Sequence, residues 1–279
     1  MHIIKYRWLA EGSLQPFLIS AGQEKIRLVG EAINFSVGEK HCIGYFAGGK
    51  YSPCPSRALI DSGWNCSACR ISDDFFMCMR CDGSECINKK QRLGCEQDVY
   101  YIYLAAFDSI IKVGISREQR LVERLVEQGA DFGAKVARVK DGKDVRSIEQ
   151  KIKRELGIVD LVRGELKQRM IFCDPNRCIS KLFHAMSALR ANGFAQYLVP
   201  AEIYDLRSYY GLQNVYYNPQ PVKVQAGMQL SGDVAAVKGP IIVLKEGSRL
   251  YSVNAHDLIG SDVEADKSMN TEVSASNAV

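Results

Sequence analysis

Hydrophobic and polar residues alternate in short stretches near both ends of the chain. In residues 1–40 the stretches FLIS, KIRLVG and INFSVG are separated by glycines, and the alternation returns in residues 201–260. A period of two is typical of half-buried antiparallel strands. The pattern therefore predicts a β-rich segment at each end. Because each segment is too small to bury a hydrophobic core alone, we expect the two to pack together.

The middle of the chain changes from strand to helix periodicity. Two apolar stretches within residues 99–116 are separated by Asp108-Ser109, which predicts two strands joined by a tight turn. In residues 117–128, leucine and valine recur at helical spacing, so a helix should follow at once, with Ser116 as its N-cap. One more strand and two more amphipathic helices complete an α+β domain, which we place at residues 99–200.

Length and hydropathy set broad limits on the fold class. The 279 residues are enough for two or three modest domains. No apolar run approaches the roughly 20 residues needed to cross a bilayer, and the N-terminus lacks a signal-peptide core. We therefore expect a cytoplasmic protein with no membrane partner. Residues 261–279 are small and polar without periodicity, which predicts a disordered tail.

The net charge of +4 is uninformative as a total, but its distribution is not even. Residues 99–170 contain 15 lysine and arginine residues against 11 acidic residues, while the last 19 residues contain four acids and one lysine. A mildly basic middle with an acidic tail fits a polyanionic partner. The same distribution is also compatible with an ordinary solvated surface.

Cysteine is concentrated in one part of the chain. Eight of the ten cysteines lie in residues 41–98, a segment with little periodicity. In a reducing compartment such clustering indicates metal binding, because a C-x-x-C turn places two thiolates on one side of an ion. The candidate zinc ligands divide into two sets of four: Cys42, Cys54, Cys66 and Cys69, then Cys78, Cys81, Cys86 and Cys95.

The sequence leaves the pairing of these cysteines open. The two C-x-x-C pairs, at residues 66–69 and 78–81, are close enough in sequence to form one site, with Cys86 and Cys95 spare. Four thiolates leave no open coordination position, so one or two zinc ions would be structural. An iron–sulfur cluster and free buried cysteines are the alternatives. Cys173 and Cys178 are predicted to be ordinary buried residues at the start of a helix.

The stretch VYYIYLAAFDSIIKVGISREQRLVERL resembles the GIY-YIG nuclease superfamily. VYY at residues 99–101 stands in place of GIY, and KVG at residues 112–114 stands in place of YIG after the superfamily's interval of ten residues. The chain is also similar to an uncharacterised prokaryotic family that couples a cysteine-rich region to a KVG-x-S…R-x-x-x-R-L-x-E-Q-G-A core. The resemblance implies a GIY-YIG-like hairpin and helix domain behind a zinc-binding module.

The resemblance also implies an active site for phosphodiester cleavage. A tyrosine would take part in proton transfer, an arginine would bind phosphate, and a glutamate would hold Mg²⁺ or Mn²⁺. Two further side chains would contact phosphate. The residues at the matching positions are Tyr101 or Tyr103, Arg120 or Arg124, Glu149, and the phosphate contacts Lys112 and Ser116.

Three functions follow from these observations. The first is a divalent-metal-dependent endonuclease acting on DNA or RNA. Because Val99 and Lys112 replace the glycine and the tyrosine of the superfamily motif, the second is a non-catalytic, zinc-containing nucleic-acid-binding protein. The third is a zinc-stabilised adaptor for protein interactions. Tyrosine, arginine and Glu149 converging on one cleft would favour catalysis, whereas Glu149 facing elsewhere would favour binding.

Overall fold

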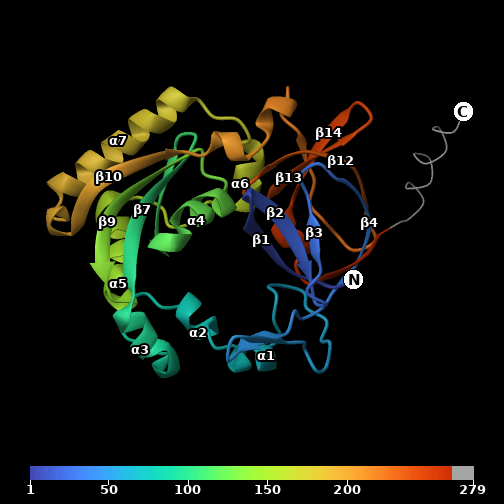
Figure 1. Cartoon of the computed structure of the whole chain (residues 1–279), viewed down its shortest axis with the longest axis horizontal. Coiled ribbons are helices and arrows are strands. Elements are labelled where there is room, and N and C mark those ends of the chain that lie inside the picture. Colours follow the sequence, from blue (N-terminus) through green and yellow to red (C-terminus); the bar gives the residue numbers. More distant parts are fainter. Residues whose placement is uncertain (266–279) are drawn as a thin grey trace, which may run out of the picture.

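Mixed α and β structure extends over residues 1–265, the part of the chain that the computed structural model describes (Figure 1). The chain opens with an antiparallel three-stranded sheet. Its strands are β1 (Ile3–Glu11), β2 (Ser13–Ser20) and β3 (Lys25–Arg27). The burial of β1 alternates along the strand, so its apolar side chains face the core and its polar ones face solvent, as the sequence pattern predicts.

A six-stranded sheet joins the two ends of the chain. Strand β4 (Ala32–Lys40) pairs with β12 and β15, in the order β11-β14-β13-β12-β4-β15. The expectation that the two β-rich ends pack together is therefore met. The remaining strands are β11 (Gln220–Pro221), β12 (Gln229–Lys238), β13 (Ile241–Glu246), β14 (Arg249–Asn254) and β15 (Ser261–Ala265), with the short helix α8 (Ala255–Leu258) after β14.

Strand β15 corrects the prediction of a disordered tail from residue 261. It pairs antiparallel with β4, and its Val263 side chain is buried in the main hydrophobic core. The free edge of β4 offers backbone hydrogen bonds that a composition argument does not take into account. The rest of that predicted tail, residues 266–279, lies outside the described residues.

The central sheet has four strands in the order β10-β9-β7-β8. The predicted hairpin is present as β7 and β8, paired from Tyr100 to Phe107. The elements of this part are β7 (Val99–Phe107), β8 (Ile110–Arg117), α4 (Leu121–Gln128), β9 (Phe132–Lys140), α5 (Gly142–Leu156), α6 (Gly164–Arg169), α7 (Pro175–Ala191) and β10 (Leu198–Asp205). Strand β10 crosses residue 200, so the sheet extends past the predicted domain boundary.

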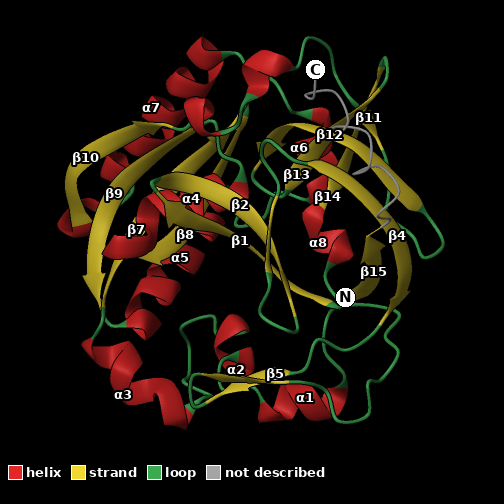
Figure 2. Cartoon of the chain, turned by 45° about the vertical axis from the view of Figure 1, so that its right-hand side comes forward, coloured by secondary structure: helices red, strands yellow, loops and turns green. Residues whose placement is uncertain are grey.

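The two faces of the central sheet are covered differently. Ile102, Leu104 and their neighbours on one face pack against α5 and α7 in a core of their own. Tyr103 and Ala105, on the other face, share the main core with α4 and the β-rich part of the molecule. Helix α4 accordingly lies between the central sheet and the β-rich part in Figures 1 and 2.

Helix α4 begins later than the sequence predicts. Strand β8 runs on to Arg117, and a 3-10 turn at residues 118–120 leads into the helix. The Ser116 hydroxyl donates to the Arg117 carbonyl oxygen at 2.9 Å and is buried, so Ser116 is not the N-cap. The prediction was wrong because Tyr100 and Tyr101 keep Arg117 and Ser116 paired in the sheet.

The cysteine-rich segment lies along one side of the molecule, below both the central sheet and the β-rich part in Figure 1. It contains little regular structure. Its elements are β5 (Tyr45–Ala47), β6 (Lys50–Ser52), α1 (Ser67–Ser72), α2 (Phe76–Met79) and α3 (Lys89–Gln97). No helix within the described residues is both long enough and apolar enough to cross a membrane.

Candidate functional site

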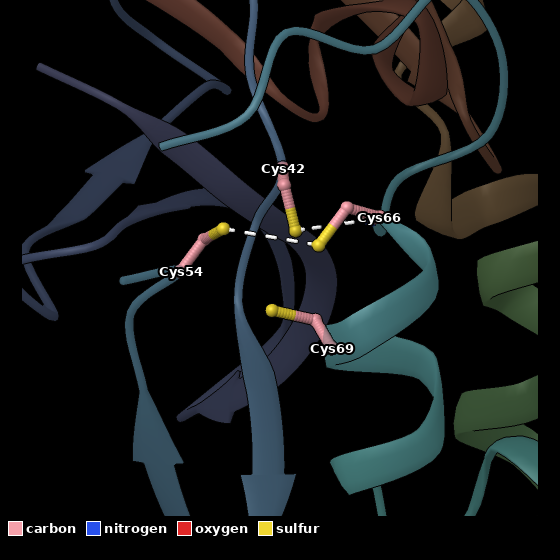
Figure 3. Close-up of side chains that lie close together, drawn as sticks. All are labelled: Cys42, Cys54, Cys66 and Cys69. Atoms are coloured by element: carbon pink, nitrogen blue, oxygen red, sulfur yellow. Dashed lines mark hydrogen bonds between the residues drawn. The ribbon is translucent and has the colours of Figure 1, made fainter. Parts of the chain in front are cut away.

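The first set of cysteines forms a compact cluster. The sulfur atoms of Cys42, Cys54, Cys66 and Cys69 all lie within 4.8 Å of one another, and they point toward a common centre (Figure 3). Cys42 follows β4, Cys54 follows β6, and the C-x-x-C pair begins α1. These four thiols lie close enough together to bind a metal ion.

The cluster fits the geometry of a four-thiolate metal site. Metal–sulfur bonds of about 2.3 Å in a tetrahedron place neighbouring sulfurs about 3.8 Å apart, and the Cys54 and Cys66 sulfurs are 3.9 Å apart. Burial raises the pKa of the Cys42 thiol, and the backbone N–H groups of Cys66 and Gly44, which donate to its sulfur at 3.1 and 3.4 Å, counteract part of this rise. Burial raises the pKa of the Cys69 thiol, so a bound cation would be needed to hold all four sulfurs deprotonated.

Gly44 explains how the chain brings two of these ligands together. Its backbone has a φ of +83°, and a Cβ there would overlap the Ser52 carbonyl oxygen and lie 2.9 Å from Pro53. Only glycine allows this close approach of the segment after β4 to the segment after β6.

His41 precedes Cys42 directly and could in principle replace a thiolate as a metal ligand. Its Nδ1 instead lies 3.3 Å from the Asp262 carboxylate.

The cluster decides how the eight cysteines divide. Cys66 and Cys69 lie with Cys42 and Cys54, so the alternative in which they share one site with the second C-x-x-C pair does not hold. The second set does not form an equally tight group in the described chain. Its four members nevertheless line a single cavity of about 230 Å³: Cys78, Cys81, Cys86 and Cys95.

Cys173 and Cys178 lie in a third environment. Cys178 is fully buried, as predicted, whereas Cys173 is half-buried. Both sulfurs lie near the Asp131 carboxylate, in a group compact enough for a metal. However, the Lys238 ammonium is 2.6 Å from that carboxylate and supplies the positive charge that the site needs.

A separate cleft of about 590 Å³ opens between the central sheet and the β-rich part. Six basic and two acidic side chains line it. The basic ones are Arg7, Lys112, Arg120, Arg124, Arg163 and Lys167, and the acidic ones are Glu127 and Asp160. Low-dielectric walls focus the field of such an excess, so the cleft attracts anions.

Several elements bring these charges together. Lys112 comes from β8, Arg124 from α4, and Lys167 from α6, and Tyr6 of β1 and His256 of α8 line the same cleft. Lys112 points to this side because it faces Ala105 across the hairpin. The cleft is therefore a product of the packing between the central sheet and the β-rich ends.

The basic residues of the cleft differ in how far they are neutralised. Arg120 is paired with Glu123 at 2.5 Å and with Glu127 at 3.5 Å. By contrast, Lys112 and Lys167 form no ion pair anywhere in the described chain, and Arg124 reaches only the Glu127 carboxylate, at 3.8 Å. Unpaired cations in a cleft leave an uncompensated charge that a bound anion would satisfy.

Burial shifts the protonation of two groups in the cleft. Burial, together with the charges of Lys112 and Arg124, lowers the pKa of Lys167 to about 7. Burial and the charges of Lys167 and Arg124 lower the pKa of His256 to about 4, so this imidazole is neutral near neutral pH. The His256 ring also packs edge-on against Trp64, which lies two residues before Cys66, at 5.8 Å between centroids. Through Trp64 and His256, the cleft thus contacts the segment that carries Cys66 and Cys69.

The predicted site residues are only partly brought together. Lys112, Arg120 and Arg124 line the cleft, but Tyr101 and Ser116 do not. Tyr103 is almost completely buried, and its hydroxyl accepts a hydrogen bond from Gln128, which does line the cleft.

Glu149 lies on the other side of the central sheet from α4, because its helix α5 packs on the opposite face. It does not line the cleft, and only 9% of it is exposed. Burial raises the pKa of its carboxyl and the Asp160 charge adds to this, while the charge of Lys112 counteracts both. Glu149 therefore interacts electrostatically with Lys112 of the edge strand β8 but does not form part of the cleft surface.

The comparisons with known proteins give one match. A family model described as "Protein of unknown function (DUF2797)" matches residues 30–263. The chain belongs to the DUF2797 family. No curated protein and no solved structure matches it. The span matched by DUF2797 includes all eight clustered cysteines and most of the cleft, but not Tyr6 or Arg7 of β1.

Five basic or acidic cleft residues of this DUF2797 member were not expected from its sequence and reach the cleft from outside the hairpin and helix: Arg7, Asp160, Arg163, Lys167 and His256. The only local signal is the basic stretch around residues 163–169. Which way this stretch faces depends on contacts of α6 with β14, such as the hydrogen bond from the Gln168 side chain to the Ser252 carbonyl oxygen. No periodicity in the sequence indicates these contacts.

Proposed function

We propose that this protein is a nucleic-acid-directed protein that binds phosphate groups in the cationic cleft. The observation that carries the proposal is the set of cleft side chains that have no acidic partner within residues 1–265, Lys112, Arg163 and Lys167, next to the weakly paired Arg124. Phosphate is the commonest biological anion that needs several such donors, and arginine binds it in a bidentate manner. A volume of about 590 Å³ is sufficient for a nucleotide-sized group.

The order of elements in the central part of the chain is compatible with this proposal. The hairpin β7–β8 is followed by helix α4, as the resemblance to the GIY-YIG superfamily implies. The two predicted arginines and Lys112 gather at one place on this frame. In this proposal the four-cysteine cluster holds zinc, which has a structural role because its coordination positions are filled.

Cleavage of the bound nucleic acid is the second candidate. Glu149 and Asp160 are two carboxylates whose charges influence each other beside Lys112. Carboxylate oxygens are the ligands that Mg²⁺ and Mn²⁺ prefer, and a metal there would stabilise the leaving oxygen of a phosphodiester. The burial of Glu149 away from the cleft surface makes binding without cleavage the better supported of the two.

Salt-dependent binding tests the proposal directly. Labelled single-stranded and duplex DNA and RNA are titrated with the protein at several salt concentrations, and affinity is followed by fluorescence anisotropy. Arg124→Ala should weaken binding by about tenfold and reduce the slope of log affinity against log salt by about one, because one phosphate contact is lost. Arg190→Ala, which removes an exposed charge of α7 outside the cleft, is the matched control and should leave both values unchanged.

The same samples separate the remaining possibilities. Cutting in the presence of Mg²⁺ that is lost in Glu149→Gln, with binding retained, would establish the endonuclease. Binding that Arg124→Ala and Arg190→Ala weaken equally would place the interface outside the cleft. Absence of binding to any nucleic acid at low salt would contradict both nucleic-acid functions and favour a protein-interaction adaptor.

A further inference from the structure

The segment between Cys69 and Tyr101 has no hydrophobic core. Gly83 is its only buried residue, and several large apolar side chains remain exposed. These are Ile71, Phe75, Met77, Met79, Ile87 and Leu93. Two short helices without apolar burial do not hold a fixed arrangement on their own, because ordering the chain costs about 1–2 kcal/mol per residue. Another interaction has to hold this segment in place.

The second set of cysteines could supply such an interaction, because four thiols can bind a metal ion. All four thiols line the same cavity of about 230 Å³, contributed by α2, α3 and the loop between them. Asn88 contacts two of them: its side-chain N–H donates to the Cys78 sulfur at 3.2 Å, and its backbone carbonyl oxygen accepts from the Cys86 thiol at 3.5 Å. Such contacts around a set of thiols are typical of the outer shell of a metal site.

We propose that Cys78, Cys81, Cys86 and Cys95 bind a second structural metal ion, Zn²⁺, independent of the first. Each thiol gives up its proton to solvent and forms one sulfur–zinc bond, so four protons leave and no electron is transferred. Closing the four sulfurs around the ion shrinks the cavity and brings Phe75, Met77 and Ile87, which also line it, into contact.

The site would fasten the cysteine-rich segment to the central sheet. Cys95 of α3 lies directly against Gly142 at the start of α5, where a Cβ would overlap its sulfur. Gly83 packs against the α5 backbone in the same way, next to Ser147. Arg92 of α3 makes a double hydrogen bond to the Asp141 carboxylate, at 2.6 and 2.5 Å. The second metal would thus order the chain that leads into α5 and β7.

Metal counting on the full-length protein tests the proposal. The chain is purified with zinc present, dialysed, and its zinc measured by mass spectrometry against protein concentration. We expect two ions per chain in the wild type and one in Cys78→Ser/Cys95→Ser. The double variant Cys54→Ser/Cys66→Ser should also retain one, and Cys173→Ser, a cysteine outside both sets, should retain two.

A second measurement covers the case in which a variant fails to fold. Wild-type protein is stripped partially with a chelator and digested with a protease of broad specificity. Loss of the second ion should expose cleavage sites within residues 70–98 while the central sheet stays intact. One ion per chain in the wild type, or two ions in Cys78→Ser/Cys95→Ser, would overturn the proposal.

Discussion

Lys167 carries a charge that changes near neutral pH. Its ammonium lies 5.1 Å from the centre of the Phe107 ring and has no acidic partner in the described chain. Because burial lowers its pKa from 10.5 to about 7, the charged form is destabilised in the folded protein. Folding stability should therefore rise with pH between these two values, as the unfolded chain keeps a proton that the folded chain has lost.

The same titration should control anion binding. As pH rises through about 7, Lys167 loses its proton and the cleft loses one positive charge. Affinity for a phosphate-bearing ligand should then fall by up to about tenfold per pH unit above this value. In Lys167→Arg the guanidinium stays charged, so the decline should disappear. Dissociation constants measured from about pH 6 to about pH 8.5 for both proteins check this, and parallel profiles would contradict it.

For single residues, the sequence predicts a shared location only for side chains that lie close together along the chain. Arg120 and Arg124 share a helix face, and Lys112 stands on the adjacent strand, so all three could be assigned to one place. Lys167 and His256 could not, because they reach the cleft only after α6 and α8 have packed against other elements. The resemblance named Glu149 as a metal ligand but left open which way it faces, because only the packing of α5 on the opposite face of the sheet decides this.

The hairpin β7–β8 is the element that the sequence predicts best. Two apolar strands separated by a two-residue turn leave little freedom in register. The structure adds a constraint that no pattern contains. Tyr103 lies across Gly114 on the neighbouring strand, so closely that the tyrosine ring occupies the space of a side chain there. The glycine of the KVG stretch therefore has a packing role.

Gly114→Ala tests this packing. The added methyl group would overlap the Tyr103 ring, and displacing a buried aromatic side chain should destabilise the protein by about 1–3 kcal/mol. Unfolding in urea measures the change. Gly22→Ala is the matched control, because its Cβ would meet only the Ser20 hydroxyl, at 3.6 Å, and its effect should stay within about 0.5 kcal/mol. Equal effects for both variants would rule out the packing role.

Elements were mispredicted where a distant partner decides their limits. The sequence predicts Ser116 as a helix cap, but pairing with β7 keeps it in the sheet. The sequence also predicts a polar tail from residue 261, but residues 261–265 form β15 because they pair with the edge of β4. Local sequence contains neither partner. The cysteine segment is the reverse case. Its spacing predicted that Cys42, Cys54, Cys66 and Cys69 come together, which the structure confirms, while its lack of periodicity predicted almost no secondary structure.

A buried ion pair links the two halves of the whole molecule. Asp131, just before β9, and Lys238, at the end of β12, are 1% and 4% exposed and lie 2.6 Å apart. The Lys238 ammonium also donates hydrogen bonds to the carbonyl oxygens of Met170 and Ile171, at 3.0 and 2.9 Å. The pair therefore connects the central sheet, the end of α6 and the six-stranded sheet.

Breaking the pair from one side should be costly. Lys238→Met leaves the Asp131 charge buried without a partner and should reduce the free energy of unfolding by about 3–5 kcal/mol. Asp131→Asn/Lys238→Met removes both charges and should recover part of this loss. Lys245→Met, an exposed lysine on β13, should change stability by less than about 0.5 kcal/mol. A double variant no more stable than Lys238→Met would contradict this account.

The position of β4 between β12 and β15 has a consequence for synthesis. Both neighbours of this strand lie near the other end of the chain, so β4 leaves the ribosome with neither of its edges covered. At about 5–20 residues per second, the wait for residue 263 lasts roughly 10–45 seconds. Until β12 and then β15 are made, the open edges of this half-apolar strand are available to other chains, so the nascent protein should be a client for chaperones.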